Sequence, residues 1–291
     1  MAFFRRKKTE PAPAETQGAP EIPVTLALSL SENADPENVA ALLSALPEHA
    51  EVALSGGAGE LALPEGKNIS VIEDAGRYSG KYVVRADGNE KSDKERAEEL
   101  FGFLSAAEED LIFFGEKAQE SDPLADTIAG KRPLPAHCAA KRELAQGTRE
   151  LGRTYAESFV PLLFAKSAAC VSLSLGEAKN TRTHAEACSV LALAEFFNKV
   201  KPALDADRYR FAFNFICKEW IGCLARASLA GKSEEIADAD AKLKETNMAL
   251  WVAVAEKAPL GFAGVLRKKN YTLPLYLKTA LKALSVFKKQ L

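Results

Sequence analysis

The sequence predicts an α/β protein in which a mostly parallel sheet of about five strands is followed by a mainly helical C-terminal region. Between residues 23 and 115, short apolar or β-branched runs alternate with segments whose apolar residues recur at helical spacing. Beyond residue 135, helical spacing dominates and strand-like runs become rare. An apolar fraction of 47% and a charged fraction of 27% are typical of a chain with a packed core and a hydrated surface.

The α/β part opens with the pattern of a strand, a helix and a second strand. Val24 to Leu30 reads VTLALSL, an apolar run with strand-like alternation. Asp35 then supplies a helix N-cap, and Pro36 suits the first helical turn. Glu51 to Leu54 is the second expected strand, and Ser55-Gly56-Gly57 ends it. One face of the helix between them carries Val39, Leu42, Leu43 and Leu46. Such a unit is typical of a parallel sheet.

Three further strands are expected before residue 115, at Ile69 to Ile72, Lys81 to Arg85 and Asp110 to Phe114. Between the last two, Ser92 and Glu95 have the spacing of a capping box, which predicts the start of a helix. That helix would pack through Ala97, Leu100, Phe101 and Leu104.

Three parts are expected along the chain. Residues 1–22 are rich in Pro, Ala, Glu and Gly and predict a disordered tail, because this composition cannot build a core. Residues 23–135 form the α/β domain, which ends in a polar, proline-bearing stretch. Residues 136–291 form a mainly helical region, with one late strand at Val171 to Leu175 and a basic C-terminal helix.

The net charge, the apolar stretches and the cysteines of the chain indicate its partners and its cellular location. The formal net charge is −2, so no global basic field would recruit nucleic acid, and we expect none as a partner. No uninterrupted apolar stretch reaches the roughly 18 residues of a membrane span. The five cysteines form no CxxC pair and have mostly apolar neighbours, which predicts buried reduced thiols and a cytoplasmic location.

The C-terminal segment Arg267 to Leu291 is distinctive because it is basic. From Ala263 onward the chain has no acidic residue but has seven Lys or Arg residues. One interpretation is an amphipathic helix on an anionic membrane surface, which would make the protein membrane-associated. The other is a helix packed on its own domain with its lysines in water.

Two acid-bearing turns follow expected strands of the sheet. Glu73 and Asp74 come directly after the third strand, and Asp87-Gly88-Asn89 follows the fourth. Ligands of parallel α/β sheets bind at the carboxyl ends of strands, so we expect a binding site at these turns. The alternative is that Asp87-Gly88 is an ordinary turn, since this dipeptide often forms one.

The stretch from Gly80 to Asn89, GKYVVRADGN, resembles the strand and D-x-D motif of family 2 glycosyltransferases of the GT-A type. The similarity extends from Pro23 to Phe114 and, in general layout, to the helical end. It implies a GT-A or Rossmann-like sheet. In that family the acids of the motif hold a divalent cation on the diphosphate of a sugar nucleotide. By this match Asp87 and Asn89 would hold Mg²⁺ or Mn²⁺, and Asp74 would lie beside the nucleotide.

Four departures from the family pattern are visible. Asn89 stands in the last D-x-D position and brings an amide carbonyl in place of a carboxylate. Ser55-Gly56-Gly57 stands where the family has an aspartate after the second strand. The third and fourth strands are too close for the family's intervening helix. No motif identifies a catalytic base, although Asp122 and Asp126 lie in the region where an acceptor-side acid is expected.

The resemblance therefore implies a glycosyltransferase-like protein that uses a nucleotide-sugar donor in cell-envelope glycan or glycolipid synthesis. The departures leave open a catalytically inactive relative that acts as a partner or scaffold protein. A third interpretation, an unrelated α/β protein with a helical interaction domain, would make the Asp87 turn a simple connection.

Overall fold

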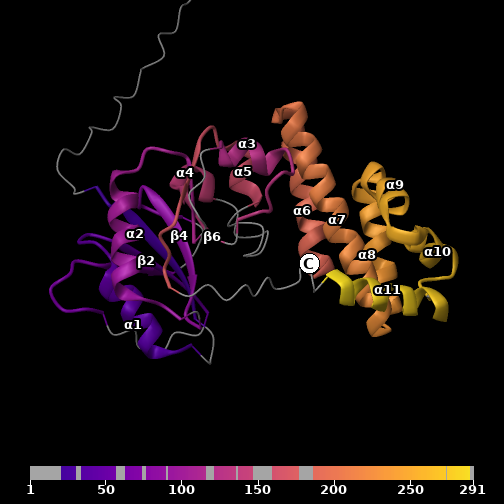
Figure 1. Cartoon of the computed structure of the whole chain (residues 1–291), viewed down its shortest axis with the longest axis horizontal. Helices are drawn as coiled ribbons and strands as arrows, with labels where there is room; N and C mark the ends of the chain where they lie inside the picture. The colour runs from indigo at the N-terminus through magenta and orange to yellow at the C-terminus, as the bar shows by residue number, and fades with distance from the viewer. Residues whose placement is uncertain are drawn as a thin grey trace, which may run out of the picture.

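A computed structural model of the chain describes residues 21–30, 34–56, 63–73, 77–89, 91–115, 121–135, 137–146, 159–176, 186–272 and 274–288. Residues 1–20 of the expected N-terminal tail (1–22) lie outside these residues, whereas the carbonyl of Ile22 accepts a hydrogen bond from the Lys81 N–H at 2.9 Å. An α/β part lies beside a helical part, and the long helix α7 (Ala206–Ala230) runs along the boundary between them (Figure 1).

The sheet contains seven strands among the described residues, in the order β3-β2-β1-β4-β6-β5-β7. All neighbouring pairs are parallel except the two that β6 makes with β4 and β5. This mostly parallel sheet followed by helices confirms the predicted fold class. The strands are β1 (Val24–Leu30), β2 (Glu51–Gly56), β3 (Ser70–Glu73), β4 (Tyr82–Asp87), β5 (Leu111–Phe114), β6 (His137–Lys141) and β7 (Ala168–Val171).

The sheet has more strands than the expected five and extends beyond residue 135. Strand β6 was not predicted, because its sequence HCAAK is short and alanine-rich and carries no β-branched residue. Its strand geometry comes from pairing with β4 and β5. The late strand was expected at Val171 to Leu175, but β7 pairs over Ala168–Val171 instead, where it extends the sheet beside β5.

Helices cover the two faces of the sheet. One face packs against α1 and α2 in a core that includes Leu26, Val84 and Ile112. The other face, which includes Ala27, Val83 and Phe113, packs against α3, α4 and α5. The helices of this part are α1 (Pro36–Ala45), α2 (Lys94–Ala106), α3 (Pro123–Ile128), α4 (Arg142–Ala145) and α5 (Val160–Phe164).

Helix starts follow local capping chemistry. Asp35 caps α1 as predicted, accepting a hydrogen bond from the Glu37 N–H at 3.0 Å. The predicted capping box at Ser92 and Glu95 is wrong by one residue: the N-cap of α2 is Asp93, which accepts from the Arg96 N–H at 3.3 Å. Ser92 is held in an isolated bridge to Gly176 instead.

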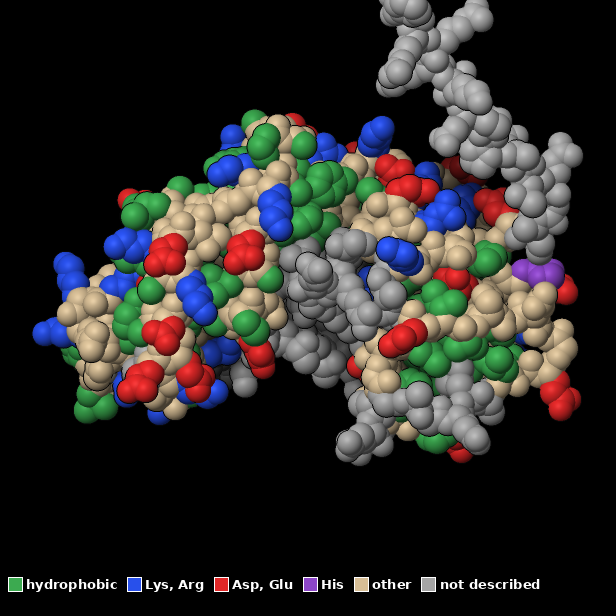
Figure 2. Space-filling model, turned by 180° about the vertical axis from the view of Figure 1, so that it is seen from behind, with side chains coloured by type: hydrophobic (Ala, Val, Ile, Leu, Met, Phe, Trp, Pro, Cys, Tyr) green, Lys and Arg blue, Asp and Glu red, His purple; other side chains and the backbone are tan. Residues whose placement is uncertain are grey.

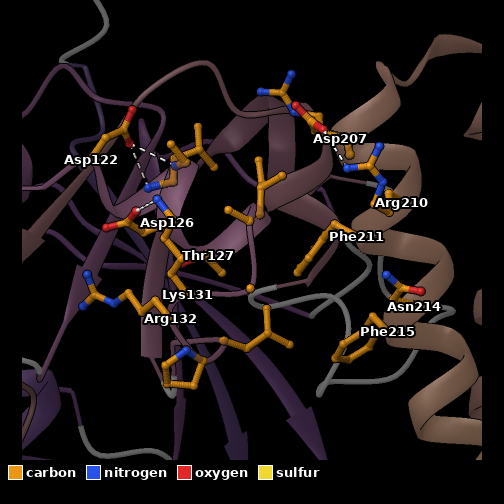
Figure 3. A pocket seen from close by; sticks show the side chains of 18 of the residues that line it. Asp122, Asp126, Thr127, Lys131, Arg132, Asp207, Arg210, Phe211, Asn214 and Phe215 are labelled. Carbon is orange, nitrogen blue, oxygen red and sulfur yellow. Dashed lines mark hydrogen bonds and ion pairs between the residues drawn. The ribbon is translucent and has the colours of Figure 1, made fainter.

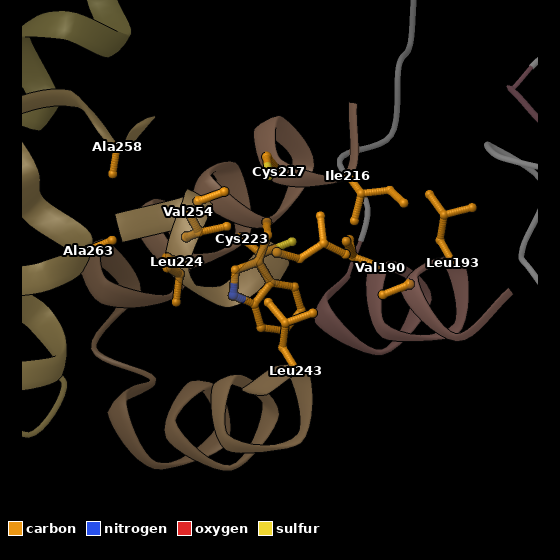
Figure 4. Packing of buried hydrophobic residues seen from close by; sticks show 14 of the residues in the cluster. Val190, Leu193, Ile216, Cys217, Cys223, Leu224, Leu243, Val254, Ala258 and Ala263 are labelled. Atoms are coloured by element: carbon orange, nitrogen blue, oxygen red, sulfur yellow. The ribbon is translucent and has the colours of Figure 1, made fainter. Parts of the chain in front are cut away.

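The helical part has its own core, in which side chains from α6 to α10 converge (Figure 4). Val190, Leu193 and Phe197 of α6 are buried in it, as are Ile216, Trp220 and Leu224 of α7. Tyr209, near the start of α7, is 39% exposed. The elements are α6 (Ala187–Val200), η3 (Lys201–Ala203), α7, α8 (Ser233–Thr246), α9 (Met248–Lys257), η4 (Pro259–Gly261), α10 (Phe262–Lys268) and α11 (Leu275–Lys288).

A fully buried carboxylate, Asp240, joins four helical segments. Its Oδ1 accepts from Trp220 Nε1 at 2.8 Å and Arg267 Nη2 at 2.9 Å. Its Oδ2 accepts from Trp251 Nε1 at 2.8 Å, Arg267 Nε at 2.7 Å and the Tyr271 hydroxyl at 2.8 Å. Burial alone would raise the pKa of Asp240, but the hydrogen bonds of Arg267 and Trp220 and the charge of Arg267 outweigh it and lower this pKa.

This cluster corrects one part of the expected membrane-facing segment. The Arg267 side chain is only 9% exposed and is paired with Asp240, so it belongs to the core and not to a basic surface. Leu277 and Leu281 of α11 are also buried against the helical core. The outward-facing cations of the segment begin at Lys268 and Lys269.

Among the described residues, no single helix has the length and apolar character needed to cross a membrane. One bent pair, Met248–Lys257 with Pro259–Lys268 at 107°, has that length and composition. Its apolar residues Leu250, Val254, Phe262 and Leu266 are buried in the helical core, as in an ordinary packed helix pair.

The surface of the protein carries mixed charges, and most of its cysteine thiols are buried. On the face shown in Figure 2, acidic and basic side chains are interspersed over both parts. Three of the five cysteines, Cys138, Cys217 and Cys223, are buried thiols, while Cys188 is exposed. Burial raises the pKa of Cys217 and Cys223 to about 11, which keeps both protonated.

Candidate functional site

The central strand β4 ends at Asp87, between β1 and β6 and at the carboxyl edge of the sheet. Strand order reverses beside β4, because the chain runs outward from β1 to β2 and β3 and then returns to β4. Ligands of open α/β sheets bind at the carboxyl ends of strands at such a reversal. The Asp87 side chain is half-buried there and Asn89 is exposed.

Gly88 holds the turn against the start of α1. Its N–H donates to the Ser29 carbonyl at 3.0 Å, and its own carbonyl accepts from the Asp35 N–H at 3.1 Å. A Cβ at this position would lie 3.0 Å from both the Ala34 Cβ and the Leu30 Cδ2, so a larger residue would crowd the turn. The position of Asp87 is therefore determined by backbone packing and not by the acid itself.

Asp87 and Asn89 are brought together by an Asx turn. Asp87 Oδ1 accepts from the Asn89 N–H at 3.1 Å and from Asn89 Nδ2 at 3.0 Å. The Asn89 amide nitrogen thus faces Asp87, and the amide carbonyl is the oxygen that it offers to a cation. The two side chains supply one carboxylate and one neutral carbonyl.

Strand register adds two hydroxyls to this edge. Ser29 of β1 lies opposite Asp87 of β4, and Ser55 of β2 lies opposite Ser29. Residues in register on neighbouring strands share a face, so the three side chains form a polar row across the carboxyl edge. This row was not predicted from the sequence, because register between distant strands leaves no local pattern.

A positively charged side chain, that of Arg85, lies next to this row on the same face of the sheet. Arg85 precedes Asp87 by two residues and therefore shares its face of the sheet. Its Nη2 donates to the Tyr78 hydroxyl at 3.0 Å, and its guanidinium lies 5.6 Å from the centre of the Tyr78 ring. The site thus combines a carboxylate, hydroxyls and a guanidinium, which are groups that contact phosphates, sugars and cations.

The other acids singled out from the sequence, Asp74, Asp122 and Asp126, are not placed at the Asp87 turn by the described structure. Asp74 falls in 74–76, outside the described residues. Asp122 caps α3, accepting from the Leu124 and Ala125 N–H groups at 2.9 and 3.1 Å. Asp126 pairs with Lys131 at 3.7 Å. Both acids therefore have structural partners at α3, away from the turn at β4.

The donor set at the turn fits one kind of metal binding. Within the described residues, no group of three or more His, Cys, Asp or Glu side chains is placed to hold a metal ion. An all-protein cage is therefore not formed by these residues. Mg²⁺, however, is commonly held by one or two carboxylates together with substrate phosphates. Asp87 and the Asn89 carbonyl fit a cation that arrives with a diphosphate.

Comparison with known proteins gives a likeness in structure alone. No family model matches the chain, and no curated protein matches it in sequence. Solved structures match over 86% of the chain at 10–12% identity, and these neighbours are GT-A glycosyltransferases. The chain therefore has the GT-A fold.

Among the matching structures are several of one protein, S. aureus TarS. Residues 1–349 of TarS in complex with UDP-GlcNAc match with a TM-score of 0.54, 10% identity and 89% coverage of that chain. The same fragment with UDP gives 0.51 and 12% identity. A longer TarS structure gives 0.50 at 10% identity, and the chain spans only about half of it, 54%.

Proposed function

We propose that this protein is glycosyltransferase-like and binds a nucleotide-sugar donor at the carboxyl edge of β4, in the synthesis of a cell-envelope glycan or glycolipid. The observation that carries the proposal is the place of Asp87. A GT-A sheet presents this carboxylate at the strand-order reversal, in register with Ser29. The TarS structures with UDP-GlcNAc and UDP support the choice of nucleotide.

In this proposal the residues at the carboxyl edge of the sheet bind different parts of the donor. Asp87 and the Asn89 carbonyl hold Mg²⁺ or Mn²⁺ on the diphosphate, and the cation would neutralise charge on the leaving group. Ser29 and Ser55 offer hydroxyls to the donor from the neighbouring strands. Asp74, which follows β3, is assigned to the nucleotide side.

A second candidate function is a catalytically inactive relative that serves as a partner or scaffold. The observation that favours it is the Asx turn, which commits Asp87 Oδ1 to Asn89 and leaves one neutral carbonyl as the other cation ligand. Such a set would hold a divalent cation more weakly than two carboxylates, since each lost charge lowers the attraction.

Nucleotide titration with and without Mn²⁺ tests the proposal. At UDP near 100 times its dissociation constant, bound nucleotide should stabilise the protein by about 2.7 kcal/mol in thermal unfolding. Asp87→Ala should abolish the Mn²⁺-dependent part, whereas Asp238→Ala, at an exposed acid of α8, should leave it unchanged. The absence of a response to UDP or to other nucleoside diphosphates would reject donor binding.

The proposal also includes a peripheral membrane contact at the start of α11. Leu275 is 80% exposed and Tyr276 is 67% exposed, an unusual pair of outward apolar side chains. Lys268 and Lys269 are exposed nearby in the sequence, and no acid interrupts the segment. Apolar side chains bordered by cations suit an anionic bilayer, at about 1 kcal/mol for each near-surface cation.

A further inference from the structure

A groove of about 1050 Å³ lies between α3 with its following loop and the first half of α7 (Figure 3). It is separate from the Asp87 turn, because β5 and β6 intervene in the sheet. We infer that this groove binds a neutral glycan chain. The inference goes beyond the donor site, and its test does not require transfer activity.

One wall of the groove is aromatic and rigid. Phe211 and Phe215 lie one turn apart on α7 and project towards the α3 side (Figure 3). Both rings stack on the buried ring of Phe159, with centroids 5.6 and 4.3 Å away. Their contact with Phe159 fixes them while each stays half-buried at the groove. A flat aromatic face attracts the weakly positive C–H face of a sugar ring through its quadrupole.

The opposite wall and the rim are polar and nearly balanced in charge. Six Lys or Arg residues and five Asp or Glu residues line the groove. Two pairs at the rim are Asp126 with Lys131 at 3.7 Å and Asp207 with Arg210 at 3.5 Å. The carboxylates would repel a polyanion, and the Lys and Arg side chains would repel a polycation. Hydroxyl groups both donate and accept, so a neutral polyol can use both signs.

The α7 wall of the groove is held in place against the end of α5. Arg208 of α7 donates from Nη2 to the Ala165 carbonyl and from Nη1 to Asp205, both at 2.5 Å. Asp205 caps α7, and hydrogen bonds with Arg208, led by its backbone N–H, lower the pKa of Asp205. This wall of the groove is therefore preformed, which reduces the ordering cost of binding a flexible chain.

The position of the groove suits a chain that extends towards the donor site. Arg132, which lines it, has its guanidinium 5.7 Å from the centre of the Phe113 ring of β5. Phe113 pairs with Cys138 of β6, and strand register places both on the same face of the sheet as Asp87. A glycan in the groove would thus lie on the Asp87 side of the sheet.

Affinity electrophoresis of the full chain tests the inference. The probes are the neutral polymers dextran, mannan, glycol chitin and hydroxyethyl cellulose, with polygalacturonate as an anionic comparison. At least one neutral polymer should retard the protein. Phe215→Ala should weaken that retardation about tenfold, the size expected for loss of one aromatic stacking contact.

Three further variants separate binding from folding. Phe215→Tyr keeps the ring and should keep retardation, whereas Asp207→Ala with Arg210→Ala alters only exposed groups and should weaken it. Tyr209→Ala removes an exposed aromatic of the same helix outside the groove and should have no effect. UDP binding should be unchanged in all four variants, so failure of this inference is distinguishable from failure of the proposed function.

Three outcomes would overturn the inference. The first is that no neutral polymer retards the protein. The second is that retardation is equal in the wild type and in a folded Phe215→Ala variant. The third is that only polygalacturonate retards it, which would identify the groove as a charge contact.

Discussion

Two aspartates show how surroundings decide the role of one residue type. Asp240 is fully buried and accepts hydrogen bonds from two tryptophans, an arginine and a tyrosine. Asp87 is half-buried at an edge of the sheet, where its Oδ1 accepts hydrogen bonds from the N–H and the side-chain amide of Asn89 in the same turn. The first carboxylate is committed to structure. The second is placed where an incoming cation can replace its local hydrogen bonds.

Asn89→Asp is the sharpest test at the residue scale. The variant would place a second carboxylate two residues after Asp87 on an exposed side chain, so the fold should tolerate it. Because a carboxylate adds charge to the ligand set, Mn²⁺ with UDP should bind about tenfold more tightly, or roughly 1.4 kcal/mol. Calorimetric titration would measure the change. Equal Mn²⁺ affinity in the two proteins would contradict the assignment of Asn89.

Asp240→Asn should strongly destabilise the helical part. Removing this charge leaves the Arg267 guanidinium buried without its counter-ion, which typically costs about 3–5 kcal/mol. Urea unfolding would measure the loss. Asp238→Asn, two residues earlier and exposed, is the control and should change stability by less than about 0.5 kcal/mol. Equal midpoints for the two variants would show that the Asp240 cluster contributes little.

The same carboxyl predicts how stability depends on pH. The folded-state pKa of Asp240 is lowered, so its stabilisation is complete above the unfolded pKa of about 3.9 and is lost as pH falls through the folded pKa. The stability difference between wild type and Asp240→Asn should therefore shrink below about pH 4. A difference that stays constant between pH 7 and the acid transition would contradict the lowered pKa.

At the scale of elements, the Asp87 turn depends on the close packing of β4 against β1 and α1. The Gly88 Cβ position is crowded by Leu30, Ala34 and Val39, whereas a Cβ on Gly102 of α2 would meet nothing within 4 Å. A side chain would thus be crowded at Gly88 but would have free space at Gly102.

Gly88→Ala should therefore destabilise the protein by about 1–3 kcal/mol through overpacking. Gly102→Ala should stabilise it by about 0.4–1 kcal/mol, because an exposed helical alanine loses less conformational freedom on folding. Denaturant unfolding of both variants measures the contrast. If both changes shift stability in the same direction, the packing account of the Gly88 turn is wrong.

The elements that sequence predicted well are those specified by their own residues. The α1 cap at Asp35 and the buried face of Val39, Leu42 and Leu43 follow from local pattern. Strand β4, which ends at Asp87, also follows from the local sequence pattern. The elements that sequence missed depend on partners: β6 is a strand because β4 and β5 flank it.

The candidate site divides in the same way. Asp87 and Asn89 stood out because an acidic turn after a β-branched run is a local signal. Ser29 and Ser55 did not, because only the register of β1, β2 and β4 brings them beside Asp87. The groove at Phe211 was also beyond sequence analysis, since its walls come from α3 and α7, far apart in the chain.

At the scale of the whole molecule, α7 connects the two parts. Its first half carries the Arg208 contact to Ala165 and the rings stacked on Phe159. Further along the helix, Ile216, Trp220 and Leu224 lie in the helical core. The helical part is thereby placed against the face of the sheet that also bears Asp87.

The C-terminal helix gives a whole-molecule prediction about membranes. The full chain should float with vesicles that contain anionic lipid and not with neutral vesicles, because its exposed apolar pair lies between Lys269 and Lys278 in the sequence. Leu275→Ser with Tyr276→Ser should abolish flotation, while Met248→Ser, at a site 51% exposed on α9, should not. Flotation that is absent, or unaffected by the double change, would remove the membrane contact.

The central claim is that the carboxyl edge of β4 holds a nucleotide diphosphate with its cation. A crystal of the full chain grown with UDP and Mn²⁺ tests this most directly, because the anomalous signal of Mn²⁺ locates the cation. We predict one Mn²⁺ site, coordinated by Asp87 and the diphosphate. Nucleotide bound elsewhere, or an Asp87 turn without cation in a crystal that contains both, would contradict the account.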